Sequence, residues 1–568
     1  MKKTRNKGKN NSFFVISAAV AVIAIVIAVY AVKRYAPSKE RVSLNDYFAR
    51  QDGSIAVIHN GSIDNTIPCA KIIDGELYFS LEYLKKYVDD GYVYDSVEKN
   101  LRYTTDKNVI AVNADNKNYM VDKDSVSYEK VILRDVDGKG YLNADWSKKY
   151  SDYVYTLFNN PNRVVVETAG WKKTVATLSR NTELRTHGGI KSKIVSDGKK
   201  NDSVVVIDDY GKWSKVVSSD GVLGCVQNKY LTNETSKVVK KNLEDRKFKH
   251  RKVDGKIVLA WNQISNKSAN ATAMKSLDKL ENVNVVSPTW FYIKDADGNV
   301  GNDASLDYVS YAHSKGMQVW AAIDNFRDKS VDTAHVLKTT SARDNLINQT
   351  IAAAIASNID GINVDFESIS DSEKDGYLEF IRELSLKCEK NNLILSVDNY
   401  VPTAATKFYG RKTQADYADY VVIMAYDEHF GGSKEAGSVS SFPFVRNGVK
   451  DTLKEVPKNQ IVLGLPLYTR VWCTENGNVT SSAVGMNNQY KKIGADPSEA
   501  KWLETEQQNY VEKKDGDKLY QCWIEDNKSL GKKMELVNSN GLAGAAFWKM
   551  GLGSDDIWTT ISKYIRTK

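Results

Sequence analysis

Eight strand-like apolar runs follow one another from residue 256 onward, separated by longer segments of mixed character. Each of the first seven runs is followed by enough residues for a crossover helix, and strand–helix repeats are typical of an α/β fold. Eight repeats over about 310 residues predict a (β/α)8 TIM barrel, in which parallel strands lie inside a ring of helices. The runs begin near Lys256, Val283, Gln318, Ile359, Leu393, Tyr420, Ile461 and Leu542.

The spacing of these runs changes once, before the last of them. The first seven starts lie about 27–41 residues apart, whereas about 80 residues separate the seventh start from the eighth. We therefore expect a small α+β insertion before the last strand, roughly over residues 473–526. In barrels of this kind the active site lies at the carboxyl ends of the strands.

The part of the chain before the barrel shows two further patterns. Residues 54–168 alternate short strands with Gly, Asn and Asp turns, which predicts a β-rich stalk domain. Residues 173–234 place short valine-rich strands between glycine turns, which predicts a small all-β barrel module. Residues 235–255 are rich in charged residues and are expected to be a linker to the barrel over 256–568.

An apolar run near the N-terminus, residues 13–32, is interrupted only by Ser17. At about 1.5 Å per residue it would span the roughly 30 Å hydrocarbon core of a membrane. The basic tail over residues 1–12 favours a cytoplasmic N-terminus. We therefore predict a signal-anchor, which makes a single-pass protein of the cell membrane with extracellular C-terminal domains. The alternative is a signal peptide cleaved after Val29-Tyr30-Ala31, although such apolar regions usually span only about 7–15 residues.

The net charge of +8 comes from the N-terminus. Nine of the 79 basic residues and one of the 71 acidic residues lie within residues 1–41, so the remaining chain carries 70 of each. Nucleic-acid binding requires a basic patch on a folded domain, and this composition therefore gives no reason to expect it. The five cysteines have no spacing typical of a metal site.

Residues 360–367, Asp-Gly-Ile-Asn-Val-Asp-Phe-Glu, form the segment with the strongest chemical signal. In a strand, alternate side chains face opposite sides, so Asn363, Asp365 and Glu367 share one face and apolar side chains occupy the other. The polar face would point into the barrel. Polar groups there are costly unless they are paired, and the two carboxylates therefore indicate chemistry. The plainer interpretation is a solvated acidic strand end.

The barrel segment resembles glycoside hydrolase family 18, whose central signature Asp-x-x-Asp-x-Asp-x-Glu matches residues 360–367. Further motifs follow in the order of the family, and the likeness is greatest to its bacterial branch of spore and cell-wall N-acetylglucosaminidases. These motifs are Met424-Ala-Tyr426-Asp427, Gly464-Leu-Pro-Leu-Tyr468, the closing strand up to Trp548, and the second strand ending at Trp290-Phe.

The resemblance implies a role for each matched side chain. Glu367 would protonate the leaving oxygen, Asp365 would accept the acetamido N–H and stabilise an oxazolinium ion, and Tyr426 would donate to the acetamido oxygen. In this family the acetamido oxygen of the substrate attacks the anomeric carbon, so one strong acid suffices and the configuration is retained. The expected substrate-binding residues are Asn363, Asp427, Trp548, Tyr468 and Trp290, and no metal or organic cofactor is implied.

Some of these side chains also have purely structural interpretations. Tyr426 would then fill the barrel, Asp427 would cap a helix, and Trp290 would pack in the core. Asn363 departs from the family, which often has aspartate at that position. An aspartate can share a proton with Asp365, whereas an amide can only form hydrogen bonds, so we expect Asn363 to alter the pH profile rather than abolish activity.

Two weaker resemblances concern the region before the barrel. Residues 54–168 resemble the copper amine oxidase N-terminal-like domain, without a histidine cluster that would bind copper. Residues 173–234 resemble the bacterial Src-homology-3-like domain, through Leu184-Arg185, the following glycine turn and Gly211-Lys-Trp213. Such domains often bind the cell wall, so this resemblance implies contact with peptidoglycan.

Two functions fit this domain order. The first is a membrane-anchored extracellular glycosidase that cleaves β-1,4 bonds of a polymer containing N-acetylglucosamine, either peptidoglycan, which fits a position beside the membrane, or chitin. The second is a non-catalytic carbohydrate-binding or wall scaffold protein with the family 18 fold. Lectin-like members typically lose the acid, and the presence of Glu367, Asp365 and Tyr426 therefore favours the enzyme.

Overall fold

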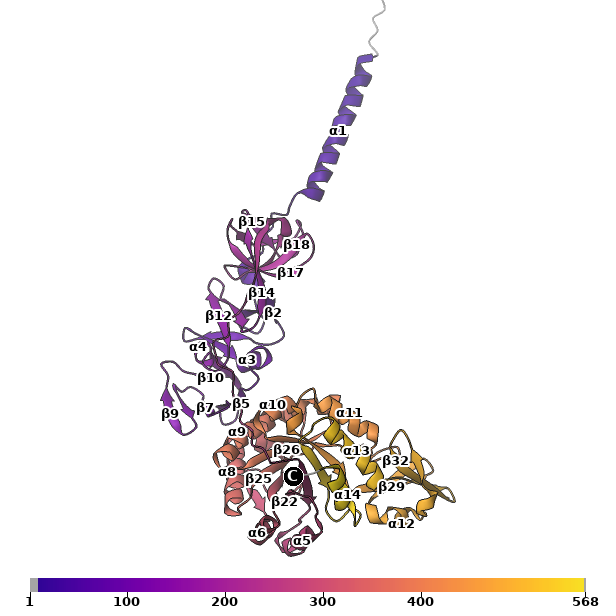
Figure 1. Cartoon of the computed structure of the whole chain (residues 1–568). Coiled ribbons are helices and arrows are strands. Elements are labelled where there is room, and N and C mark those ends of the chain that lie inside the picture. The colour runs from indigo at the N-terminus through magenta and orange to yellow at the C-terminus, as the bar shows by residue number, and fades with distance from the viewer. Residues whose placement is uncertain (1–8, 566–568) are drawn as a thin grey trace, which may run out of the picture. The chain divides into compact units, whose positions relative to one another are not determined.

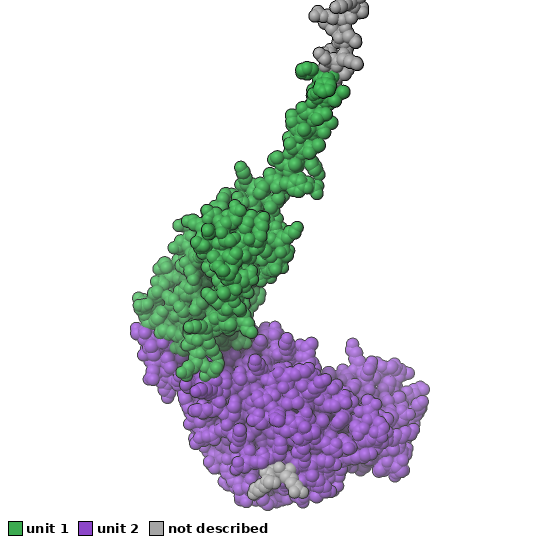
Figure 2. Space-filling view, turned by 45° about the horizontal axis from the view of Figure 1, so that its top comes forward, with its two compact units in different colours: residues 1–92, 114–117, 128–245 green, residues 93–113, 118–127, 246–568 purple. Residues whose placement is uncertain are grey.

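Two compact units make up the computed structural model, which describes residues 9–565 (Figure 1, Figure 2). The chain passes between the units more than once, because two segments of its first half belong to the second unit. The first unit contains residues 1–92, 114–117 and 128–245, and the second contains residues 93–113, 118–127 and 246–568.

A closed barrel of eight parallel strands forms the centre of the second unit and confirms the predicted TIM barrel. The first strand pairs with both the second and the last, which closes the sheet. The observed strands begin within two residues of the predicted starts. They are β21 (Ile257–Asn262), β22 (Val285–Ile293), β24 (Gln318–Asp324), β25 (Gly361–Asp365), β26 (Ile394–Tyr400), β27 (Tyr420–Met424), β28 (Ile461–Pro466) and β34 (Gly544–Trp548).

Helices between the strands cover the barrel, and their buried faces pack on the outward-facing side chains of the strands. Ser305, Asp332 and Ser441 cap three of these helices by accepting a backbone N–H of the first turn. The main helices are α5 (Asn270–Ser276), α6 (Leu306–Ser314), α7 (Thr333–Lys338), α8 (Thr340–Ala356), α9 (Lys374–Lys390), α10 (Arg411–Tyr417), α11 (Phe442–Thr452), α13 (Asn527–Ser539) and α14 (Ile557–Tyr564).

The inside of the barrel changes from apolar to polar along the strands. Trp320 and Tyr420 stack with ring centroids 5.6 Å apart in a second core of inward-facing side chains. Further along the same strands, the inward positions include Asp324, Asp365 and Asp398. The apolar layer therefore fills the amino end of the barrel and leaves the polar side chains at its carboxyl end.

An antiparallel sheet is inserted between β28 and β34, as the long gap predicted. Helix α12 (Gln489–Ile493) accompanies it and makes the insertion α+β in character. The strands are β29 (Tyr468–Glu475), β30 (Asn478–Gly485), β31 (Lys501–Leu503), β32 (Gln508–Asp515) and β33 (Lys518–Ile524).

A second antiparallel sheet joins the barrel from earlier in the chain. The hydroxyl of Thr104 donates to Glu379 on α9 at 2.6 Å, and the hydroxyl of Tyr417 donates to the carbonyl of Thr104 at 2.8 Å. These contacts give the sheet a fixed place on the barrel helices. Its strands are β5 (Val93–Asp95), β6 (Asn100–Thr104), β7 (Val109–Asn113), β8 (Asn118–Val121) and β9 (Asp124–Ser127).

Buried charges underlie this contact. Arg343 on α8 is 1% exposed, and it donates to Glu383 at 2.9 Å and to the carbonyl of Leu337 at 2.8 Å. Arg382 and Glu379, which are also buried, pair at 3.2 Å. A buried ion pair is costly to break, because the remaining partner keeps an uncompensated charge.

Replacing Arg343 with methionine should therefore lower the free energy of unfolding of the second unit by about 3–5 kcal/mol. The loss would appear as a lower denaturant midpoint in equilibrium unfolding. Arg446→Met on the exposed side of α11 is the matched control and should change the free energy by less than about 0.5 kcal/mol. Equal midpoints for the two variants would contradict the expectation.

The first unit is rich in β structure. A seven-stranded antiparallel sheet covers the region predicted to be a small all-β module. Its strands are β14 (Lys172–Leu178), β15 (Thr182–Arg185), β16 (Ile194–Gly198), β17 (Ser203–Asp209), β18 (Trp213–Ser218), β19 (Leu223–Gln227) and β20 (Leu231–Val238).

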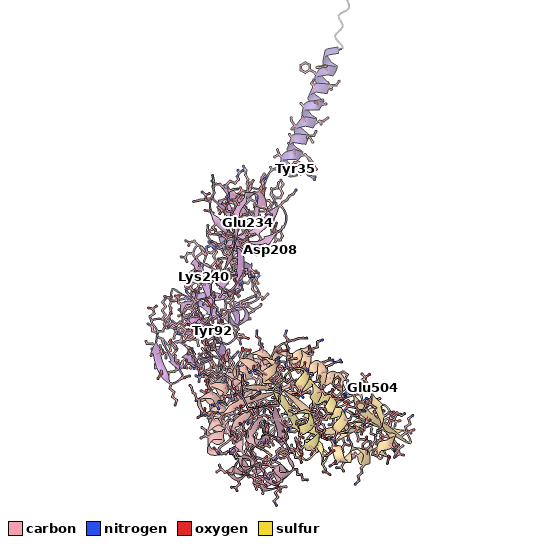
Figure 3. The ribbon with its side chains drawn as sticks, in the orientation of Figure 1. Tyr35, Tyr92, Asp208, Glu234, Lys240 and Glu504 are labelled. Atoms are coloured by element: carbon pink, nitrogen blue, oxygen red, sulfur yellow. The ribbon has the colours of Figure 1, made fainter. Side chains whose placement is uncertain are left out.

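Two four-stranded sheets and short helices complete the β-rich part of the first unit. Figure 3 labels Tyr92, the last residue before the chain enters the sheet β5–β9. One sheet contains β1 (Ala56–His59), β2 (Ser62–Ile63), β12 (Tyr153–Phe158) and β13 (Arg163–Thr168). The other sheet contains β3 (Ala70–Ile73), β4 (Glu76–Ser80), β10 (Leu133–Val136) and β11 (Lys139–Asn143). The helices are α2 (Leu44–Tyr47), α3 (Leu81–Tyr87) and α4 (Ala144–Ser147).

Helix α1 (Lys9–Tyr35) contains the predicted apolar run. Its segment Phe13–Tyr35 has a mean hydropathy of 2.9 and is long enough to cross a membrane. Signal peptides and signal-anchors both meet this description, so the helix by itself does not distinguish them. Residues 1–8 of the predicted cytoplasmic tail lie outside the described residues.

Candidate active site

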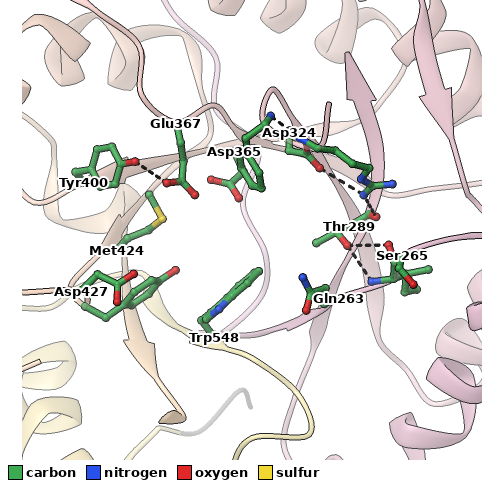
Figure 4. A pocket seen from close by; sticks show the side chains of 14 residues that line it. Gln263, Ser265, Thr289, Asp324, Asp365, Glu367, Tyr400, Met424, Asp427 and Trp548 are labelled. Carbon is green, nitrogen blue, oxygen red and sulfur yellow. Dashed lines mark hydrogen bonds and ion pairs between the residues drawn. The ribbon is translucent and has the colours of Figure 1, made fainter. Parts of the chain in front are cut away.

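A cavity of about 470 Å³ opens at the carboxyl ends of the barrel strands (Figure 4). Five of the eight predicted site residues line it: Asp365, Glu367, Tyr426, Asp427 and Trp548. The remaining lining residues are Gln263, Ile264, Ser265, Thr289, Asp324, Phe326, Arg327, Tyr400 and Met424.

Strand β25 brings the two central carboxylates together. Asp365 is its last residue, and Glu367 follows on the same side. The amide side chain of Asn325, just after β24, holds the backbone of Glu367 from both sides. Its Nδ2 donates to the carbonyl of Glu367 at 2.9 Å, and its Oδ1 accepts from the N–H of Glu367 at 2.8 Å. Asn325 therefore fixes the backbone from which the side chain of Glu367 extends.

The environment of Glu367 favours its protonated form. Burial raises the pKa of this carboxyl group, and the charges of Asp427 and Asp324 raise it further. The hydroxyl of Tyr400 on β26 donates to Glu367 Oε2 at 2.5 Å, which lowers the pKa in part. Glu367 is thus a carboxyl group with a raised pKa whose hydrogen bond to Tyr400 limits the shift.

Replacing Tyr400 with phenylalanine should move the alkaline limb of the pH profile of kcat/KM to higher pH. The bond from Tyr400 stabilises the ionised form of Glu367, so its loss raises the pKa of Glu367 further. A carboxyl group that must be protonated then remains protonated to higher pH. Rates measured across pH for both proteins test this shift.

The matched control for Tyr400 is Tyr311→Phe. Tyr311 also donates to a carboxylate, Asp278, at 2.6 Å, but this exposed pair lies outside the cavity. It should leave the profile unchanged. An alkaline limb that stays in place in Tyr400→Phe, or moves equally in both variants, would contradict the assignment.

Asp365 is 6% exposed, and its pKa is raised well above the usual value. Burial is the largest cause, followed by the neighbouring carboxyl groups of Asp398, Glu367 and Asp324. Tyr426 lies beside it in the cavity, and burial together with Asp365 raises the pKa of its hydroxyl well above 10. Tyr426 therefore keeps a neutral O–H that donates hydrogen bonds.

Asn363 lies beneath the cavity and is completely buried. Its Oδ1 accepts from Trp261 Nε1 at 3.0 Å and from Ser287 at 3.2 Å. Its Nδ2 donates to Ser396 at 2.9 Å and to Asp398 Oδ1 at 2.7 Å. These four bonds use the full hydrogen-bonding capacity of the amide, and Asn363 therefore contacts the neighbours of Asp365 rather than the cavity.

Asp427 and Trp548 form the wall opposite the two carboxylates (Figure 4). Tyr468 does not line the cavity, but its hydroxyl donates to Asp427 Oδ1 at 2.5 Å and orients that carboxylate. The backbone of Asp427 has φ +55°, in the left-handed region that non-glycine residues rarely adopt. Trp548 meets Trp261 edge to face at a centroid distance of 5.8 Å.

Trp290 is not brought into the cavity. It is completely buried, and its indole N–H donates to Asn270 at 2.9 Å within the helical layer. The register of β22 shifts between Thr289 and Phe291, so strict alternation fails at this point. Thr289 lines the cavity in its place.

The far side of the cavity holds charged residues that sequence motifs did not indicate. Arg327 bonds to Asp303 at 2.9 Å and lies over the ring of Tyr292 at 4.4 Å. Asp324 ends β24, and burial raises its pKa despite Arg327. The available signal was the polar pair Asp324-Asn325 at the end of an apolar strand. Within the described residues, no group of three or more His, Cys, Asp or Glu side chains is arranged to hold a metal ion.

Comparisons with known proteins agree with this geometry. The sequence profile of Glycosyl hydrolases family 18 matches residues 261–553. A glycosylase of Bacillus subtilis, YvbX, whose function is uncharacterized, is 25% identical over 322 residues, which cover 54% of this chain and 93% of the relative. The cortical fragment-lytic enzyme of Bacillus subtilis is 27% identical over 237 residues, which cover 40% of this chain and only 54% of the relative.

Among solved structures, a chitinase-like C-terminal domain from Desulfitobacterium hafniense superimposes with a TM-score of 0.50 at 20% identity. The match covers 55% of this chain and all of that domain. At this identity the likeness supports the barrel fold alone.

Proposed function

Because the chain belongs to glycosyl hydrolase family 18, we propose that it cleaves β-1,4 bonds of a polymer containing N-acetylglucosamine, with peptidoglycan as the preferred polymer. The observation that carries this proposal is the position of Glu367. It is a carboxyl group with a raised pKa at the carboxyl end of β25, in a cavity that also contains Asp365, Tyr426 and Trp548.

The first step requires a proton for the leaving oxygen. Glu367 is the general acid, and its raised pKa favours the protonated form that this step requires. Family 18 enzymes need no second carboxylate as nucleophile, because the acetamido oxygen of the substrate attacks the anomeric carbon. The glycosidic bond breaks as the new C–O bond forms, and a cyclic oxazolinium ion results.

Asp365 and Tyr426 hold the acetamido group during this step. Asp365 accepts the acetamido N–H and provides a negative charge beside the oxazolinium ion. Tyr426 donates its neutral O–H to the acetamido oxygen, which orients this oxygen toward the anomeric carbon. Both groups act inside a mostly buried site, where electrostatic stabilisation is stronger than in water.

Trp548 provides an apolar floor for the ring of the reacting sugar, and Asp427, oriented by Tyr468, binds its hydroxyl groups. In the second step the ionised Glu367 removes a proton from water, which attacks the anomeric carbon from the face that the leaving group left. Two inversions at one carbon give retention of configuration.

The domain order supports peptidoglycan over chitin as the substrate. In this proposal α1 is a signal-anchor, residues 54–168 are a stalk domain of copper amine oxidase N-terminal-like type, and residues 173–234 are a Src-homology-3-like module that contacts the wall. Residues 235–255 link them to the catalytic barrel over 256–568, so the cavity works outside the cell and close to the membrane. One relative is named for the lysis of cortical fragments, which agrees with a wall polymer as the substrate.

The test is an incubation of the full-length chain, in detergent, with purified peptidoglycan and separately with N-acetylchitohexaose. Mass spectrometry identifies the new reducing ends, and NMR at early times identifies the anomer released. The proposal expects reducing N-acetylglucosamine ends in the β configuration, with peptidoglycan cleaved faster. If the protein binds the wall but cleaves neither polymer, the glycosidase hypothesis fails and the non-catalytic scaffold hypothesis takes its place.

A further inference from the structure

Two buried carboxyl groups, Asp365 and Asp398, occupy neighbouring positions on two paired strands, and Asp365 also lines the cavity. Strands β25 and β26 pair in parallel, with Asn363 opposite Ser396 and Val364 opposite Val397. Asp365 and Asp398 are the next residues on the two strands, both facing into the barrel. Neighbouring strands lie about 4.8 Å apart, so the two side chains are close neighbours.

One oxygen of each carboxyl group has no partner in the described part of the structure. These atoms, Asp365 Oδ1 and Asp398 Oδ2, are buried and accept no hydrogen bond. Asp398 is 1% exposed. Two ionised carboxylates in this arrangement would repel each other and would lack hydration as well. A single proton shared between them removes both costs.

The amide of Asn363 decides where that proton lies. Its Nδ2 donates to Asp398 Oδ1 at 2.7 Å, so Oδ1 is already an acceptor. Asn363 is itself fixed by Trp261 Nε1, Ser287 and Ser396. A proton on Asp398 therefore lies on Oδ2, the oxygen without a partner.

We propose that Asp398 is a positioning residue that donates an O–H from Oδ2 to Asp365 Oδ1, and that Asn363 orients it for this purpose. The two carboxyl groups then hold one proton, and Asp365 keeps a negative charge for the substrate. This inference rests on the proposed function. It places the proton partner of Asp365 on the neighbouring strand β26, because the amide of Asn363 has no carboxyl proton to share.

The electrostatic surroundings agree with a neutral Asp398. The pKa of Asp398 is raised to about 8, mainly by burial. The hydrogen bond from Asn363 lowers this pKa in part, and the charge of Glu367 raises it. The charge of Asp398 in turn raises the pKa of Asp365. The other titratable groups that face this pair are Asp324 on β24, Tyr377 on α9, Tyr400 on β26, Tyr409 before α10 and Tyr426 after β27. Arg411 on α10 lies beside Tyr377 and Tyr409.

The reaction keeps this proton in place. Glu367 gives its own proton to the leaving oxygen and recovers one from water, while the proton of Asp398 stays on the carboxyl pair throughout. The active form thus needs two carboxyl protons, one on Glu367 and one on Asp398. Loss of both at high pH gives log kcat/KM a limiting slope of −2 against pH.

The decisive variant is Asp398→Asn, made in the full-length chain. Its amide has the same shape and keeps a donor toward Asp365, but it has no proton to lose. Activity near pH 6 should stay within about fivefold of the parent, and the alkaline slope should change from −2 to −1. Asp398→Ala, which removes the donor, should lower kcat at least tenfold with a smaller change in KM.

Val397→Ala is the matched control, because it disturbs the same strand from its buried outer face. It should lower stability and keep the slope at −2. A purely structural role for Asp398 predicts that Asp398→Asn also keeps the slope of the parent, and that result would overturn the inference.

Infrared difference spectroscopy tests the proton without any substrate. A buried protonated carboxyl has a carbonyl band above the carboxylate region, and the band of Asp398 should be present at pH 6 in the parent and absent in Asp398→Asn. If the parent cleaves no polymer and the band is still lost in the variant, the shared proton stands and the proposed function fails. If the variant retains every such band, the shared proton is refuted whatever the activity.

Discussion

Glu367→Gln should lower kcat on the preferred polymer by about 10²–10⁴-fold, which is the usual contribution of a positioned general acid. Glutamine has the same shape and keeps an acceptor for Tyr400, but it has no proton to give to the leaving oxygen. The variant should still bind substrate, so KM should change much less than kcat. Initial rates of reducing-end formation at several substrate concentrations separate the two effects.

The control for this variant is Glu373→Gln, the same change six residues later. Glu373 accepts the N–H of Ser370 in a capping box before α9, outside the cavity. Glu373→Gln should keep kcat within about twofold of the parent value. A Glu367→Gln enzyme that retains half of the parent activity would remove Glu367 from the role of acid.

Asp365→Asn should lower kcat by about 10²–10³-fold, similar to the loss of one donor from an oxyanion hole. The amide removes the negative charge beside the oxazolinium ion, and its NH₂ group competes with the acetamido N–H. Asp365 is nearly buried, and its neighbours are other carboxyl groups. The loss should persist across pH, since an amide does not titrate.

Asp360→Asn is the matched control within the same eight residues. Asp360 precedes β25 at the opposite end of the barrel, where it accepts from the N–H of Val319 at 2.7 Å and contacts His313 at 2.8 Å. It should cost stability and leave kcat nearly unchanged. Equal losses of kcat in Asp360→Asn and Asp365→Asn would indicate a general effect on the fold.

The barrel was predictable because each of its strands is a short apolar run with a helix-length segment behind it. Asp365, Glu367, Tyr426 and Trp548 were predictable for a related reason: they stand at or just after strand ends, within motifs that are continuous in sequence. Strand geometry then carries them into one cavity without further information.

The remaining site residues depend on how neighbouring strands pair, which the local pattern does not contain. Asn325 and Tyr400 reach Glu367 from β24 and β26, and Asp398 meets Asp365 only through the register of β26 against β25. Trp290 shows the converse. A shift of register at the end of β22 turns it away from the cavity, and strict alternation would not reveal that shift.

A shortened catalytic protein needs the sheet formed by β5–β9. A shortened chain beginning at residue 256 would keep all eight barrel strands but lack this sheet, which belongs to the same compact unit. Glu379 would lose its bond from Thr104, and Tyr417 would lose its acceptor. Such a fragment should be prone to aggregation and to proteolysis at α9. The smallest catalytic fragment that stays soluble and resists proteolysis must therefore begin before Val93.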